Sequence, residues 1–171
     1  MLIDKTVIFA VINDRLKALT QVAITAANQA HETATHSETV ARSKYETFGL
    51  EASYLAHGQA QRVADCKTAE AMFDALNIRG FGIDDAIDFG AVVVVRDGED
   101  RTQLLFIGPA AGGVRVKLPL KVTNLPQGLD EVMVITPSSP LGAVLMGRYQ
   151  DDEVVIHIGG EQKRYLISLV A

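Results

Sequence analysis

The distribution of proline and glycine along the chain constrains its fold more than any other feature. All five prolines lie beyond residue 108, and of the 14 glycines only Gly49 and Gly58 come before Gly80. Because both residue types break helices, the first part of the chain can form long helices, whereas the remainder must contain turns. We therefore predict an α+β protein with a helical hairpin at 1–78 and a sheet domain at 79–171.

Apolar residues in the first part recur mainly at gaps of three and four, which places them on one side of a helix. One series is Ile12, Leu16, Leu19, Ala23, Ala26 and Ala30. A second is Phe48, Ala52, Leu55, Cys66, Ala69, Phe73 and Leu76, with Gln59 and Arg62 in its middle. The two series predict an antiparallel coiled coil whose tip lies near residues 33–44.

The second part contains short apolar runs bounded by turn residues, a pattern typical of β-strands. We predict strands at 91–96, 101–107, 114–118, 132–136, 152–158 and 164–170, with a hairpin at Asp97-Gly98 and another at Gly159-Gly160. Between the fourth and fifth strands, Ser139 suits the N-cap of a short helix, Pro140 its first residue and Gly147 its end. The pattern predicts a small antiparallel sheet with one helix packed on it.

Composition and charge exclude several classes of protein. The chain has 16 basic and 21 acidic residues, a net charge of −5, and no basic run longer than Lys163-Arg164, which disfavours direct binding to DNA or RNA. Its one cysteine, Cys66, cannot form an internal disulfide. The apolar runs are too short for a membrane span, so we expect a cytoplasmic protein without membrane association.

Motifs of enzymatic sites are absent from the sequence. His31 and His36, in the run HETATH, are five residues apart and would point about 140° away from each other on a helix, so they do not form a zinc pair. The glycine-rich run at 108–113 has no following GK[ST], which excludes a phosphate-binding loop. The sequence shows no combination of nucleophile, base and pocket, and we expect a protein that is not itself an enzyme.

The C-terminal half contains several short motifs in a fixed order. The run SPLGAVLMG at 139–147 is followed by Asp152-Glu153-Val154-Val155, then by Gly159-Gly160 and Tyr165-Leu166-Ile167. In these motifs and their order, this half resembles the C-terminal domain of the Gre transcript-cleavage factors. The resemblance extends over residues 87–171 and implies an FKBP-like sheet domain. It also implies that bacterial RNA polymerase is the partner, with docking through the motif that contains Ser139, Pro140 and Gly147.

In that family the coiled coil enters the secondary channel of the polymerase. Two acidic residues at its tip help to hold a magnesium ion of the polymerase, which hydrolyses backtracked RNA with its own active site. The factor itself carries no cofactor. The resemblance therefore implies tip carboxylates, for which Glu38 is the first candidate and Glu46 and Glu32 are the next.

The tip region differs from the family pattern, and this leaves three functions open. Residues 33–46 contain no D-x-x-E motif, and Arg42 and Lys44 add positive charge, which repels magnesium. The protein could stimulate RNA cleavage, or it could be a non-cleaving regulator or inhibitor that occupies the channel. The third reading is a helical dimerisation or scaffold protein that does not bind polymerase. The sequence leaves the oligomeric state open.

Overall fold

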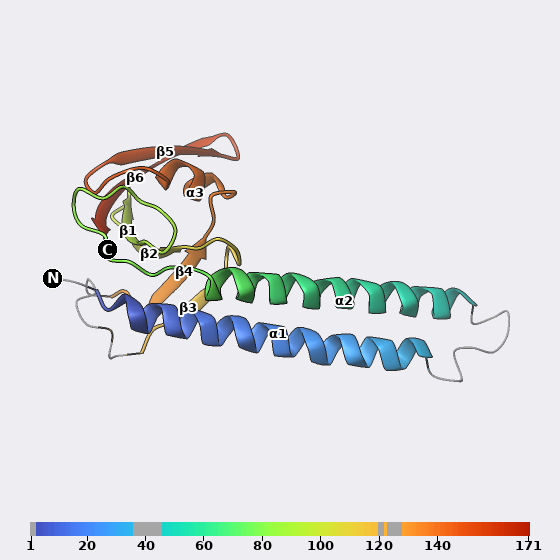
Figure 1. The fold of residues 1–171 in the computed structure, drawn as a ribbon. Helices are drawn as coiled ribbons and strands as arrows, with labels where there is room; N and C mark the ends of the chain where they lie inside the picture. The colour runs from blue at the N-terminus through green and yellow to red at the C-terminus, as the bar shows by residue number, and fades with distance from the viewer. Residues whose placement is uncertain (1–2, 36–45, 120–121, 123–127) are drawn as a thin grey trace. The chain divides into compact units, whose positions relative to one another are not determined.

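The computed structural model describes residues 3–35, 46–119, 122 and 128–171, and the side chains of 46–49 lie outside this description (Figure 1). Contacts group the chain into two compact units. One unit joins Met1–Asn13 with Met72–Ala171, and the other, which we call the arm, is Asp14–Ala71. Each unit is described here by itself.

The arm consists mainly of two long helices, α1 (Lys5–Thr35) and α2 (Glu46–Asp74), which lie side by side as a hairpin (Figure 1). Residues 5–13 of α1 and 72–74 of α2 belong to the other unit. The predicted column of α1 is confirmed, since Ile12, Leu16, Ala23 and Ala30 are buried and Leu19 and Ala26 are partly buried. The predicted tip falls mostly outside the described residues, because α1 continues to Thr35 and α2 begins at Glu46. Within the described residues, no helix is long and apolar enough to cross a membrane.

The packed column of α2 differs from the prediction. Leu55 is 57% exposed and Arg62 is also exposed, so neither belongs to the seam between the helices. The column instead follows an alternating spacing of four and three: Ala52 and Phe73 are buried, and Ala56, Gln59, Val63, Cys66 and Glu70 are partly buried. Helical periodicity fixes which positions face α1, and here it places small and polar residues inside and a leucine outside.

The other unit contains one six-stranded sheet with the strand order β3-β4-β2-β1-β6-β5. Its members are β1 (Val92–Asp97), β2 (Thr102–Ile107), β3 (Arg115–Lys117), β4 (Glu131–Ile135), β5 (Glu153–Ile158) and β6 (Glu161–Val170). The short helix α3 (Pro140–Leu145) follows β4. The predicted α+β class and the six strands are confirmed. However, β2 and β4 pair in parallel, so the sheet is mixed and not wholly antiparallel.

Both faces of the central strands are covered. Because successive residues of a strand point to opposite faces, Val93, Val95, Leu105 and Ile107 share the core that includes Leu145 of α3. On the other face, Phe106 of β2 stacks on Phe73 of α2 and on Phe9 of α1, with ring centroids 5.9 and 6.2 Å away. The start of α1 and the end of α2, which belong to this unit, therefore cover the second face of the sheet. The sequence pattern did not predict this layer.

Candidate functional site

The C-terminal motif folds as a capped helix. Ser139 has an extended backbone, and its hydroxyl accepts a hydrogen bond from the Gly142 amide at 3.0 Å and donates one to the Thr136 carbonyl at 2.9 Å. Pro140 is the first helical residue, where its missing N–H costs nothing. Gly147 follows the helix with φ +74° and donates to the carbonyl of Ile87 at 2.9 Å. The predicted cap, first residue and stop of this helix are thus confirmed.

Gly142 explains why this motif tolerates no side chain at its centre. A Cβ atom built on Gly142 would overlap the carbonyl of Thr136, a backbone group that cannot rotate away. The close approach lets α3 lie on the sheet, with Leu145 fully buried and Leu141, Val144 and Met146 packed against the core. Pro140 and Gly147 are nevertheless exposed and Ser139 is half-buried, so the motif also presents surface that a partner can reach.

The three candidate carboxylates lie at or between the helix ends that residues 36–45 connect. Glu32 is exposed in the last turn of α1, and Glu46 is the first residue of α2. Glu38 lies outside the described residues. The described residues include no group of three or more His, Cys, Asp or Glu side chains that could hold a metal ion by themselves. Glu32 can offer a hard oxygen ligand to magnesium only together with groups from elsewhere.

A cluster of charged and aromatic residues lies where the segment after α2 meets the start of α1, and the sequence did not reveal it. The side chain of Lys5 is largely buried, and its part-buried amino group donates to the carbonyl of Arg79 at 2.6 Å and lies 4.4 Å from the ring centroid of Phe81. The Arg79 guanidinium lies 3.9 Å from that centroid and 3.6 Å from the Asp85 carboxylate. Burial, and next the charge of Arg79, lower the pKa of Lys5 to about 8. This cluster fixes the segment after α2 within its unit.

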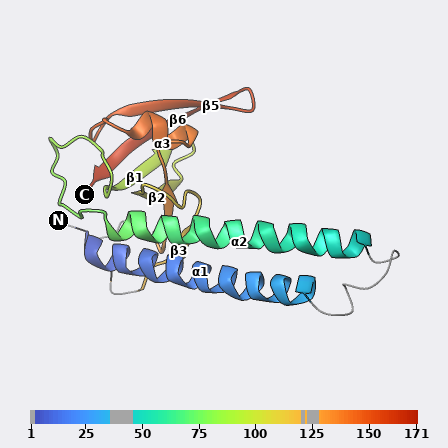
Figure 2. The same cartoon turned by 45° about the vertical axis from the view of Figure 1, so that its right-hand side comes forward.

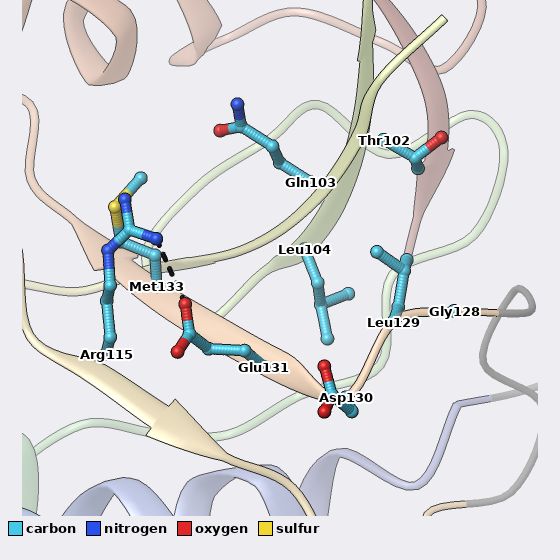
Figure 3. Close-up of a pocket in the computed structure, with 9 residues that line it drawn as sticks. All are labelled: Thr102, Gln103, Leu104, Arg115, Gly128, Leu129, Asp130, Glu131 and Met133. Carbon is cyan, nitrogen blue, oxygen red and sulfur yellow. Dashed lines mark hydrogen bonds and ion pairs between the residues drawn. The ribbon is translucent and has the colours of Figure 1, made fainter.

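A cleft of about 240 Å³ opens beside β2, β3 and β4, and Figure 3 shows its nine lining residues. Its lining residues are Thr102, Gln103, Leu104, Arg115, Gly128, Leu129, Asp130, Glu131 and Met133. Two of its charges neutralise each other, because Arg115 and Glu131 form an ion pair at 3.0 Å. The nine residues include no histidine, cysteine or lysine, and their remaining carboxylate is that of Asp130.

Comparison with known proteins gives a match in structure but not in sequence. No family model matches the chain, and no curated protein matches it. Among solved structures, the transcription factor Gfh1 matches with a TM-score of 0.37 and 15% identity, covering 92% of both chains. Gfh1 (GreA factor homolog 1) of Thermus thermophilus gives a TM-score of 0.36 and 19% identity over 93% of this chain and 94% of that one. The elongation factor GreA/GreB of Nitrosomonas europaea gives a TM-score of 0.34 and 18% identity over 62% of this chain and 78% of that one. The chain is thus structurally similar, at low identity, to transcription factors of the Gre type.

Proposed function

We propose that this protein is an accessory factor of bacterial RNA polymerase that works in the cytoplasm and places its helical arm in the secondary channel. The observation that carries the proposal is the C-terminal motif, whose residues recur in the Gre order and fold into a capped helix centred on Gly142. The same chain supplies a two-helix arm, as the proposed role requires.

The dimensions of the arm suit entry into a narrow passage. The part of α1 that belongs to the arm, residues 14–35, is about 33 Å long at 1.5 Å per residue. Small side chains such as Ala23, Ala30 and Ala52 occupy much of the distal seam, which lets the two helices lie close together. The arm thus combines length with a slender cross-section.

At its tip, the arm would lend carboxylates to a magnesium ion that belongs to the polymerase. Glu38 is the first candidate for this ligand, and Glu46 and Glu32 are the next. Carboxylate oxygens are ligands that magnesium accepts, and an added ligand can orient a hydrolytic water at a two-metal centre. The polymerase would carry out the hydrolysis, and this protein would act as a cofactor-free stimulator.

A second candidate function is a regulator that occupies the channel without cleavage. It is favoured by Arg42 and Lys44, which add positive charge to the segment that holds Glu38. Positive charge beside a carboxylate weakens its attraction for a metal cation.

The two functions are separated by adding the protein to purified polymerase that is halted in a backtracked complex. Cleavage stimulation predicts shortening of the RNA, which Glu38→Ala slows by about tenfold or more, in the range that loss of a positioned catalytic group produces. Glu161→Ala, at an exposed position of β6, serves as the control and should leave the rate unchanged. Binding without shortening at any magnesium concentration would establish the non-cleaving regulator. A protein that does not bind polymerase would disprove both.

A further inference from the structure

The two edges of the sheet differ in how they are protected. The strand order ends in β3 on one side and in β5 on the other, so each of these strands pairs on one side only. β3 has three residues, and two of them are the charged Arg115 and Lys117. Short length and charged side chains, lysine above all, keep the edge of a sheet from pairing with another chain. The edge at β3 is therefore protected against association.

The edge at β5 lacks these protecting features. β5 has six residues, none of them proline or lysine, and is about 20 Å long at about 3.4 Å per residue. Its main contacts with other helices and strands are with β6 and α3, and Figure 2 draws it at the outer boundary of the sheet. Within the described residues, the backbone of β5 makes no hydrogen bond outside its pairing with β6. Its outer edge therefore offers a row of backbone donors and acceptors.

The hydrogen bonds between β5 and β6 determine which residues of β5 face outward. The Ile167 amide of β6 donates to the carbonyl of Asp152 at 2.9 Å, immediately before β5 begins. In an antiparallel pair only alternate residues bond to the neighbouring strand, so residues 154, 156 and 158 turn their N–H and C=O groups toward β6. The three residues that turn these groups outward are Glu153, Val155 and His157. We call these three residues the outward row.

The outward row is complementary to a second copy of itself. When two copies of β5 pair antiparallel, outward-facing residues must lie opposite each other, and only a register centred on Val155 pairs all three of them. In this register Val155 lies opposite its own copy. At both ends of the row, Glu153 lies opposite His157 of the second copy. An imidazole N–H can donate to a carboxylate whether or not the ring is charged, so both end pairs are favourable.

The side chains of the outward row are available for this contact. Glu153 and His157 are exposed and Val155 is partly buried. All three lie on the face opposite the buried Val154 and Ile156, because successive residues of a strand alternate between faces. Glu153 forms no ion pair within the described residues. Its carboxylate can therefore accept from a histidine of another copy without losing an existing partner.

We propose that two copies of this chain pair edge to edge through β5, in an antiparallel register centred on Val155, and so join their sheets into one. The pairing adds about six backbone hydrogen bonds, two for each facing pair. Because both copies use the same surface, the contact has two-fold symmetry and closes at the dimer. A single pair of strands forms a small interface, so we expect reversible association in the micromolar range or weaker. This inference goes beyond the proposed function and does not depend on it.

Val155→Pro tests the backbone pairing. The N–H of Val155 faces outward, so a proline there should leave the chain folded while it removes the central donor of the row. Val155→Thr keeps the N–H and the β-branched shape and is the matched control. In sedimentation equilibrium of the full-length protein, the proline variant should dimerise about tenfold or more weakly, and the threonine variant within about twofold of the wild type. Circular dichroism and the thermal midpoint should show that both variants are folded.

An exchange of the two end residues tests the register. His157→Glu brings carboxylates opposite each other at both ends and should weaken dimerisation about fivefold or more. Glu153→His removes both carboxylates from these pairs and should also weaken it. The double variant, Glu153→His with His157→Glu, again places a carboxylate opposite an imidazole. Its dissociation constant should return to within about threefold of the wild-type value, as coupling between residues in contact predicts.

Every other result contradicts the inference. A wild type that remains monomeric up to near-millimolar concentration would disprove the pairing. A dimer that neither Val155→Pro nor His157→Glu weakens would be formed by another surface, such as the helices of the arm. Failure of the double variant to recover would exclude the register centred on Val155. Growth beyond the dimer would show that the association is open and not two-fold symmetric.

Discussion

At the scale of single residues, Lys5 makes the stability of the protein depend on pH. Its folded-state pKa is about 8 whereas its ordinary value is 10.5, so between these values the unfolded chain holds a proton that the folded chain has released. The wild type should therefore gain stability relative to Lys5→Met as the pH rises from 8 to 10.5, and the difference should level off below 8. The slope should stay below the roughly 1.4 kcal/mol per pH unit of a full proton, because the amino group is only part-buried.

Chemical denaturation of both proteins across this pH range measures the effect. Subtracting the curve of Lys5→Met removes the contributions of all other titrating groups. A difference that falls with pH would mean that the contact with the Phe81 ring and the bond to the Arg79 carbonyl outweigh the cost of burying the charge.

Residue roles that depend on local chemistry could be predicted from the sequence, and those that depend on distant partners could not. Ser139 and Pro140 begin a helix through neighbours a few residues away, and Gly147 ends it through its own positive φ. The partner of Lys5, in contrast, is Arg79, 74 residues further along the chain. Nothing near Lys5 in the sequence indicates that a lysine will be buried there.

At the scale of elements, the seam of the arm contains polar atoms without partners. Thr20 is 7% exposed, and its hydroxyl oxygen has no hydrogen-bond partner in the part of the chain that the structure describes. The same holds, within that part, for the buried side-chain oxygen of Gln59. A buried polar group without a partner costs about 1–3 kcal/mol, so Thr20→Val and Gln59→Leu should each stabilise the protein by about 1 kcal/mol.

A threonine that has a partner provides the control for this measurement. Thr25 is exposed and donates to the carbonyl of Gln21 at 3.0 Å, so Thr25→Val should change the unfolding free energy by less than about 0.5 kcal/mol. Urea unfolding of the three variants gives the comparison. If Thr20→Val destabilised the protein, or had the same effect as Thr25→Val, the buried Thr20 hydroxyl would not be a source of instability in the seam.

Helices and strands could be predicted where their periodic pattern is made of large apolar residues. The pairing of the strands could not be predicted. The column of α1 was found because Ile12 and Leu16 mark it. That of α2 was found only in part, since Ala52 and Phe73 were placed in it whereas Ala56 and Glu70, which carry no hydrophobic signal, were not. The parallel pairing of β2 with β4 joins strands that are separated by β3 in sequence. No local pattern encodes such a pairing, which is decided by packing of the whole sheet.

At the scale of the whole molecule, the division into two parts could be predicted from where proline and glycine occur. The layer of helix residues that covers one face of the sheet could not. The candidate site could also be predicted only in part, because Glu38 is assigned from a resemblance and from its place in the sequence between two helices.

The start of α1 and the end of α2 belong to the same compact unit as the sheet. Unfolding of the helices and of the sheet should consequently be coupled through that shared layer.

Phe73 provides the test of this coupling. It is fully buried at the end of α2, and its ring centroid is 5.9 Å from that of Phe106 in β2 and 6.3 Å from that of Phe9 in α1. Phe73→Ala should lower the unfolding free energy by about 3–5 kcal/mol, as loss of a buried aromatic side chain does. Helical circular dichroism and the NMR signals of the strand amides should still report one shared transition in urea, shifted to lower concentration. Met72→Ala, at a neighbouring residue that is 42% exposed, should cost less than about 1 kcal/mol. Separate midpoints for the two signals in the wild type would show that the stacked phenylalanines do not couple the helices to the sheet.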